Sequence, residues 1–154
     1  MRILIALFAL FAPLAAAHAA GNVSLSSEVF VEKTKPDAQG KPVVSLEPPA
    51  VVTPGDKLVF VLSYKNAGAE PATGFILTNP IPAAVSFTAA EGDGAAVSVD
   101  GGKSWGQLAA LKVAEANGTS RPATPADVTH VRWTFGRAIA VGEAGKLRFR
   151  GVVK

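Results

Sequence analysis

Hydrophobic and polar residues alternate most regularly in the segment 57–65. The larger side chains from Leu58 to Tyr64 occupy one phase, and valines fill most of the other phase. A period of two among aromatic and β-branched residues predicts a strand, and apolar residues on both faces indicate a central strand. The segments 53–56 and 66–68 contain Pro, Gly and Asn, which favour turns. We therefore expect one buried strand with a turn at each end.

The same alternation recurs along the chain, and turn residues separate most of the segments at the short spacing typical of sandwiches. The longer segments are 23–32, 130–135 and 146–150, and the shorter ones are 41–46, 74–78, 85–88 and 95–99. The pattern predicts an all-β fold, an Ig-like antiparallel β-sandwich of about seven or eight strands. The expected core residues are Leu58, Phe60, Leu62, Phe75, Leu77, Val85, Phe87, Val131, Trp133, Phe135, Leu147 and Phe149.

The segment 107–116 (QLAALKVAEA) leaves two alternatives open. It is rich in helix-forming residues and ends before Asn117-Gly118, which is compatible with a helix stop. A helix of this length is only marginally stable by itself, and Asn-Gly is also a strong hairpin signal. We favour a strand over 108–113, and we expect a loop over 119–127 because this stretch contains two prolines.

The first residues differ in kind from the rest of the chain. A charged start and an apolar run lead into small residues, and Ala17 and Ala19 supply the A-x-A spacing of a cleavage site. This pattern predicts a signal peptide over 1–19 and one domain over 20–154. We therefore expect an exported protein, periplasmic or extracellular.

Charge and composition exclude several classes of function for the exported part. Removing Arg2 with the signal leaves 14 Lys and Arg against 12 Asp and Glu, a net charge of +2. So few excess bases, spread along the chain, do not favour nucleic acid as a partner. After the signal, no apolar run reaches the roughly 18 residues of a membrane helix, so we expect a form that does not span a membrane. The chain has no Cys, which excludes a lipid attached to cysteine.

Several stretches, read in order, give a family resemblance over about residues 50–152. The matching pieces are Pro54-Gly55-Asp56, Leu58 to Tyr64, Asn66-Ala67-Gly68, Phe75 to Asn79, Ile81-Pro82, Val85-Ser86-Phe87, Trp133 and Gly142 to Gly145. In this order they resemble the bacterial Ig-like conserved repeat domain, known as domain of unknown function eleven. The resemblance implies a single Ig-like sandwich exported to the cell envelope, and it supplies no catalytic residues.

The stretch from Ser98 to Trp105 (SVDGGKSW) fits the Asp-box pattern S-x-D-x-G-x-(S/T)-W. Asp100 at this position can accept hydrogen bonds from turn amides, the glycines allow positive φ, and the tryptophan covers the loop. We expect a structural turn here. The alternative is a ligand site of Asp100, Ser104 and Trp105, in which the indole stacks on a sugar.

A basic stripe for an acidic partner would form from Arg132, Arg148 and Arg150 if the two C-terminal strands were adjacent. Alternating charge also protects exposed strands from edge pairing, which is the default interpretation.

The remaining polar residues give little support for a catalytic or metal-binding site. Glu91, Asp93 and Asp100 lack the spacing of a calcium loop, and we interpret them as solvated acids. His130 is the one histidine after the signal, so a histidine-rich zinc site is excluded, and no nucleophile-elbow motif accompanies it. We expect no cofactor and no metal.

The sequence therefore favours a non-enzymatic envelope protein that acts as an interaction or structural module with an envelope or surface protein as partner. The alternative is a carbohydrate-binding module that uses the hairpin around Trp105. A hydrolase that depends on His130 is a third class, for which the sequence carries no supporting motif.

Overall fold

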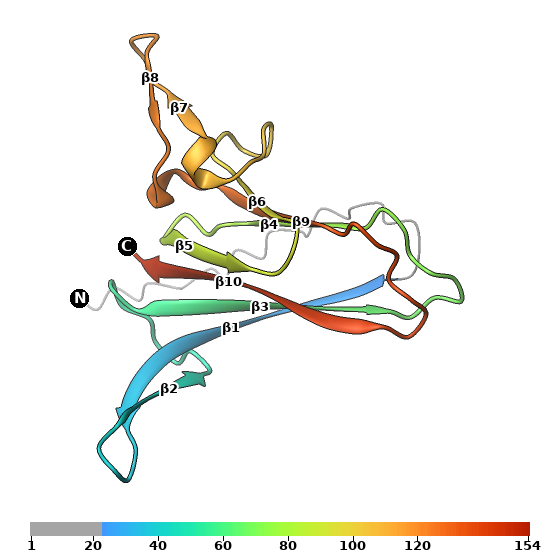
Figure 1. Cartoon of the computed structure of the whole chain (residues 1–154). Helices are drawn as coiled ribbons and strands as arrows, with labels where there is room; N and C mark the ends of the chain where they lie inside the picture. The colour runs from blue at the N-terminus through green and yellow to red at the C-terminus, as the bar shows by residue number, and fades with distance from the viewer. Residues whose placement is uncertain (1–22) are drawn as a thin grey trace, which may run out of the picture.

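The computed structural model describes residues 23–154, and the expected signal peptide over 1–19 lies outside these residues. The described part contains ten strands, which Figure 1 labels, and two short 3₁₀ helices, η1 (Leu108–Ala110) and η2 (Pro125–Asp127). The strands are β1 (Val23–Pro36), β2 (Pro42–Glu47), β3 (Lys57–Asn66), β4 (Ile76–Pro80), β5 (Val85–Glu91), β6 (Ala95–Ser98), β7 (Lys112–Ala114), β8 (Ser120–Pro122), β9 (His130–Thr134) and β10 (Ala144–Val153).

The strands form two stacked antiparallel sheets and one small hairpin. The larger sheet has the order β2-β1-β3-β10-β5, the smaller has the order β4-β9-β6, and β7 pairs with β8. In Figure 1 the β1–β2 hairpin and the β7–β8 hairpin extend from opposite sides of the stacked sheets. The predicted all-β antiparallel sandwich is confirmed, with ten strands in place of seven or eight. Within residues 23–154, no helix has the length and apolar character that a membrane crossing requires.

Strand β3 is the centre of the larger sheet, as its two apolar faces predict. It lies between β1 and β10, and its alternate residues Leu58, Phe60 and Leu62 belong to the core between the sheets. Val59 and Val61 point to the other face and are nevertheless buried. A strand that is covered on both faces needs apolar residues at every position, which explains its sequence.

Aromatic rings from both sheets fill the centre of the core. Phe60 on β3 stacks on Phe149 on β10 with ring centroids 4.3 Å apart, and the fully buried Trp133 on β9 packs against Phe149. The indole Nε1 of Trp133 donates a hydrogen bond to the carbonyl oxygen of Glu91, which joins the two sheets. Eleven of the twelve expected core residues are buried, and Phe135 is partly buried at the margin of the core.

The region 107–127 differs from the prediction. Residues 108–110 form η1 (Leu108–Ala110), and the strand expected over 108–113 begins only at Lys112. The Asn117-Gly118 pair forms a hairpin turn, in which the amide of Gly118 donates to the carbonyl of Glu115. The expected loop over 119–127 instead contains β8 and η2 (Pro125–Asp127). A hairpin pairs both of its sides, so the turn signal implied the second strand as well.

One buried polar side chain ties the end of β3 to the loops beyond it. Asn66 is fully buried, and its Nδ2 donates to the carbonyls of Glu70 and Ile139 at 2.8 and 3.0 Å. Its Oδ1 accepts from the amide of Gly68 at 3.0 Å. Because every buried polar group needs a partner, Asn66 fixes the path of both loops.

Candidate functional site

The stretch 98–105 is a tightly hydrogen-bonded turn that follows β6. Ser98 is fully buried, and its Oγ accepts from the amide of Gly102 at 2.9 Å. The Asp100 carboxylate accepts from Ser98 Oγ, from the amides of Lys103 and Ser104, and from Ser104 Oγ at 2.6 Å. The hydrogen bonds from Ser104, followed by the one from Ser98, hold the pKa of Asp100 well below its usual range.

These hydrogen bonds give Asp100 and Ser104 a structural role in the turn. Gly101 and Gly102 have φ values of 77° and 89°, where a side chain would be strained, so the two glycines permit the turn. The amide and carbonyl of Gly106 then pair with Val97, and this bridge closes the hairpin. The acceptor positions of Asp100 are therefore largely occupied within its own loop, and its role toward a ligand stays a prediction.

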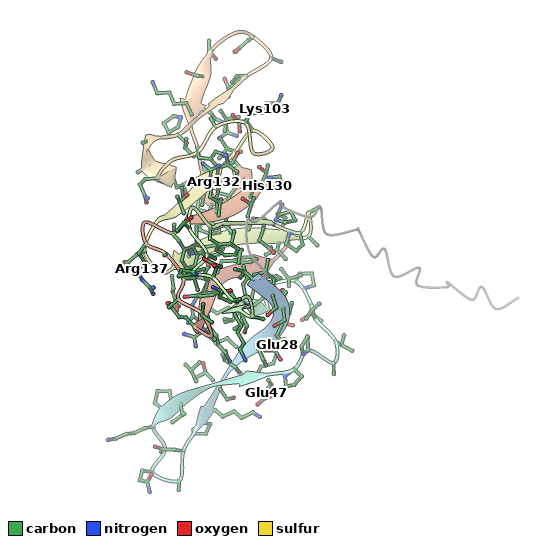
Figure 2. The ribbon with its side chains drawn as sticks, turned by 90° about the vertical axis from the view of Figure 1, so that its right-hand side faces the viewer. Glu28, Glu47, Lys103, His130, Arg132 and Arg137 are labelled. Atoms are coloured by element: carbon green, nitrogen blue, oxygen red, sulfur yellow. The ribbon has the colours of Figure 1, made fainter. Side chains whose placement is uncertain are left out.

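Trp105 lies over the outer face of the smaller sheet, where it contacts two basic side chains of β9. Its Nε1 donates to the carbonyl of Gly102 at 3.0 Å, which fixes the ring. The Arg132 guanidinium lies 4.0 Å from the centroid of the indole, a cation–π contact, and the His130 ring meets the indole edge-on. Figure 2 shows Lys103, His130 and Arg132 in the same upper part of the molecule. The sequence contains these residues, but only the packing of the turn onto β9 brings them together.

Arg132 differs from the other arginines of the described chain. It lies in the middle of β9 between Thr78 and Ala96, and its Nε is buried without a hydrogen-bond partner among residues 23–154. The remaining four arginines in that range form ion pairs with carboxylates. These pairs are Arg121 with Asp127 and Glu115, Arg137 with Glu143, Arg148 with Glu91, and Arg150 with Glu32 and Glu91.

The basic stripe of Arg132, Arg148 and Arg150 does not form. This stripe required the two C-terminal strands to be adjacent, but β9 lies in the smaller sheet and β10 in the larger one. Arg148 and Arg150 instead project from the outer face of the larger sheet, where Glu91 and Glu32 balance their charge. The alternation of each strand is visible in the sequence, but the sheet to which each belongs is not.

The acidic residues and His130 are also dispersed. Glu91 contacts the two arginines of β10, whereas Asp100 is held within its own turn. In the described part of the chain, no three His, Cys, Asp or Glu side chains gather as metal ligands would. The Nδ1 of His130 lies 3.1 Å from the hydroxyl of Thr129, its neighbour in sequence.

A second surface, which the sequence did not reveal, is the arm formed by β1 and β2. We use the name "arm" for residues 32–47, the part of this hairpin beyond β3. Five of the eight exposed large hydrophobic side chains lie on β2 or in the loop that follows it: Val43, Val44, Leu46, Val51 and Val52. A concentration of exposed apolar side chains is typical of an interaction surface. The available signal was the apolar stretch 43–52, of which we interpreted only the part up to residue 46, as a short strand over 41–46.

Searches with this chain found no matching family model, no matching curated protein and no matching solved structure. The resemblance to the conserved repeat domain therefore stays a prediction.

Proposed function

We propose that this protein is a non-enzymatic, exported component of the cell envelope that acts as an interaction or structural module and binds a protein partner through the arm. One observation carries the proposal: three exposed apolar side chains lie on β2, on a hairpin that extends from the sandwich (Figure 1), and two more lie in the loop that follows it. Burying such side chains against a partner gains roughly 25 cal/mol for each Å² of apolar surface.

The position of the arm supports a binding role over a purely structural one. Val44 and Leu46 are 57% and 42% exposed, and they lie on the same face of β2. A sandwich gains no stability from side chains that remain in water, so the presence of these apolar side chains on an extended edge strand favours contact with another chain.

Site-specific photo-crosslinking in the intact envelope tests the proposal. A photoreactive side chain at Val44 is expected to give protein adducts that the same group at Val141 does not give. Val141 is a matched control because it is 52% exposed and lies outside the arm. Equal adduct yields at the two positions, or no adducts at Val44, would reject the arm as the binding surface.

Carbohydrate binding around Trp105 is the second candidate function. The observation that favours it is the fixed indole beside Arg132, a guanidinium without a carboxylate partner in residues 23–154. An aromatic ring next to a cation suits a sugar that carries a carboxylate.

The test compares binding of neutral and uronate-containing oligosaccharides by isothermal calorimetry. Trp105→Ala and Arg132→Gln are each expected to weaken uronate binding at least tenfold, whereas Arg137→Gln, at an exposed arginine on another part of the surface, is expected to leave it unchanged. The absence of binding by the unmodified protein would remove this candidate.

A further inference from the structure

The free edge of β2 is ready to accept another strand. Strand β1 pairs with β3 as far as Val31 opposite Leu58, and beyond that point it pairs only with β2, as far as Pro36 opposite Pro42. In the described part of the chain, β2 is the outermost strand of its sheet. One side of β2 is therefore bonded to β1, and the other side pairs with no strand of residues 23–154 and is called the open side below.

The hydrogen bonds at the tip of the arm show which residues face the open side. The amide of Asp37 donates to the carbonyl of Lys41 at 2.8 Å, so these two residues form a hydrogen-bonded pair. Hydrogen-bonded and non-hydrogen-bonded pairs alternate along an antiparallel ladder. Counting along the register, Val43 and Ser45 bond to β1, whereas Val44 and Leu46 direct their N–H and C=O groups to the open side.

The two prolines of the arm agree with this assignment. Pro36 and Pro42 lie opposite each other at a non-hydrogen-bonded position, where neither needs an N–H group toward the other strand. The proline of β2 is its first residue, so it leaves the N–H groups of Val44 and Leu46 available.

The outermost strands at the other edges of the two main sheets, β5, β6 and β4, are protected, unlike β2. Strand β5 has a register shift against β10 between Arg150 and Gly151, β6 is bridged by Gly106, and β4 ends in Pro80. Bulges, covering segments and prolines all prevent edge-to-edge pairing. From Pro42 to Leu46, β2 contains no charged residue that would serve the same purpose.

We propose that the open edge of β2 pairs with the same edge of a second copy of this chain, in an antiparallel arrangement with Ser45 on the two-fold axis. This inference rests on the proposed function of the arm and names its partner. Val44 of each copy then lies opposite Leu46 of the other, and these pairs exchange four main-chain hydrogen bonds. A two-fold contact uses the same surface of both copies, so it closes without forming a fibre.

The side chains are compatible with this pairing on both faces. Two Val44 and two Leu46 side chains form one apolar cluster on the outer face. On the other face, Ser45 lies opposite Ser45, and Val43 lies opposite Glu47, so no like charges are opposed. The arm contains three lysines and three acidic residues from Glu32 to Glu47, a net charge of 3 − 3 = 0, and two arms do not repel.

Single-cysteine variants of the purified exported chain test the register, because the natural sequence contains no Cys. Directly opposed residues of an antiparallel pair have Cα atoms about 4.5–5.5 Å apart, which lies in the range that permits a disulfide. Under mild oxidation, Ser45→Cys is expected to form a covalent dimer at least tenfold faster than Val141→Cys. A mixture of Val44→Cys and Leu46→Cys is expected to crosslink faster than either variant alone. A rate for Ser45→Cys equal to that of Val141→Cys, or preferential self-crosslinking of Val44→Cys, would overturn the proposed pairing.

Sedimentation equilibrium of the unmodified protein separates this inference from the proposed function. A reversible doubling of molar mass with concentration, abolished by Val44→Lys, would support the second copy as the partner. A monomer at all concentrations that still gives photo-adducts with another protein at Val44 would reject the second copy and leave the proposed function intact. A monomer without adducts would reject both. Because Val44 is exposed in the single chain, Val44→Lys is expected to keep the unfolding midpoint of the unmodified protein at concentrations where that protein is monomeric, which checks that the variant is folded.

Discussion

Replacing Asn66 by alanine tests how the end of β3 is held. Asn66 is fully buried and makes three hydrogen bonds, two to the carbonyls of Glu70 and Ile139 and one from the amide of Gly68. A hydrogen bond within a protein contributes a net of about 1 kcal/mol, so we expect Asn66→Ala to lower the free energy of unfolding by about 3 kcal/mol. The carbonyl of Ile139 also accepts from the amide of Ala72, which keeps the cost from rising further.

Urea denaturation followed by far-ultraviolet circular dichroism measures this loss, under conditions where unfolding is two-state. A loss of this size corresponds to a decrease of roughly 10 °C in the melting temperature of a domain of this size. Asn79→Ala is the matched control, because the Nδ2 of Asn79 makes one exposed hydrogen bond to the carbonyl of Pro80. A loss for Asn66→Ala below about 1 kcal/mol, or no larger than that of Asn79→Ala, would refute the role assigned to Asn66.

Three further predictions concern the core and the turns. In Gly151→Ala the new Cβ would lie 2.3 Å from Cγ1 of Val85. Such overpacking should lower the free energy of unfolding by about 1–3 kcal/mol, measured by urea denaturation. An unchanged midpoint would contradict this. Trp133→Phe removes part of the indole and its hydrogen bond to Glu91, and a loss of about 2–4 kcal/mol is expected in the same assay, whereas a loss below 1 kcal/mol would show that the core repacks. The folded-state pKa of Asp100 is depressed, so the unfolded chain takes up the proton first as the pH falls. The stabilising contribution of the ionised Asp100 is therefore complete above about pH 5 and declines as the pH falls toward the folded-state pKa. The free energy of unfolding of Asp100→Asn should accordingly fall less between pH 4 and pH 2 than that of the unmodified protein, and equal declines would reject this contribution.

The local pattern of hydrophobic and polar residues was sufficient to predict most of the fold. The alternation in 57–65 predicted both the strand and its central position, because a strand covered on two faces has to be apolar at successive residues. The Asn117-Gly118 turn was visible for a similar reason, since the backbone of a two-stranded hairpin restricts which residues can occupy its turn. The strand predicted over 108–113 was wrong in part, because the residues of this segment suit helix and strand nearly equally. In the structure, η1 follows the bridge at Gly106 and precedes the strand.

The candidate site was less predictable from sequence. The Asp-box pattern indicated the turn from Ser98 to Trp105, whose hydrogen bonds are local, but it did not indicate that the indole lies over Arg132. That contact depends on how the turn packs against β9, in which Arg132 lies 27 residues after Trp105 along the chain. The open edge of β2 was also invisible, because whether a strand has a neighbour depends on the whole sheet.

By itself, the sequence determined most of the strands outside 107–127, which of their faces is apolar and where the chain turns between them, because these properties depend on neighbours along the chain. The tertiary structure alone decided that β9 and β10 lie in different sheets, so that Arg148 and Arg150 meet acidic residues while Arg132 meets Trp105. It also decided that β2 forms an edge with exposed valines. Pairing between distant strands is set by how the two apolar faces bury each other, and an alternating pattern does not encode the partner of each strand.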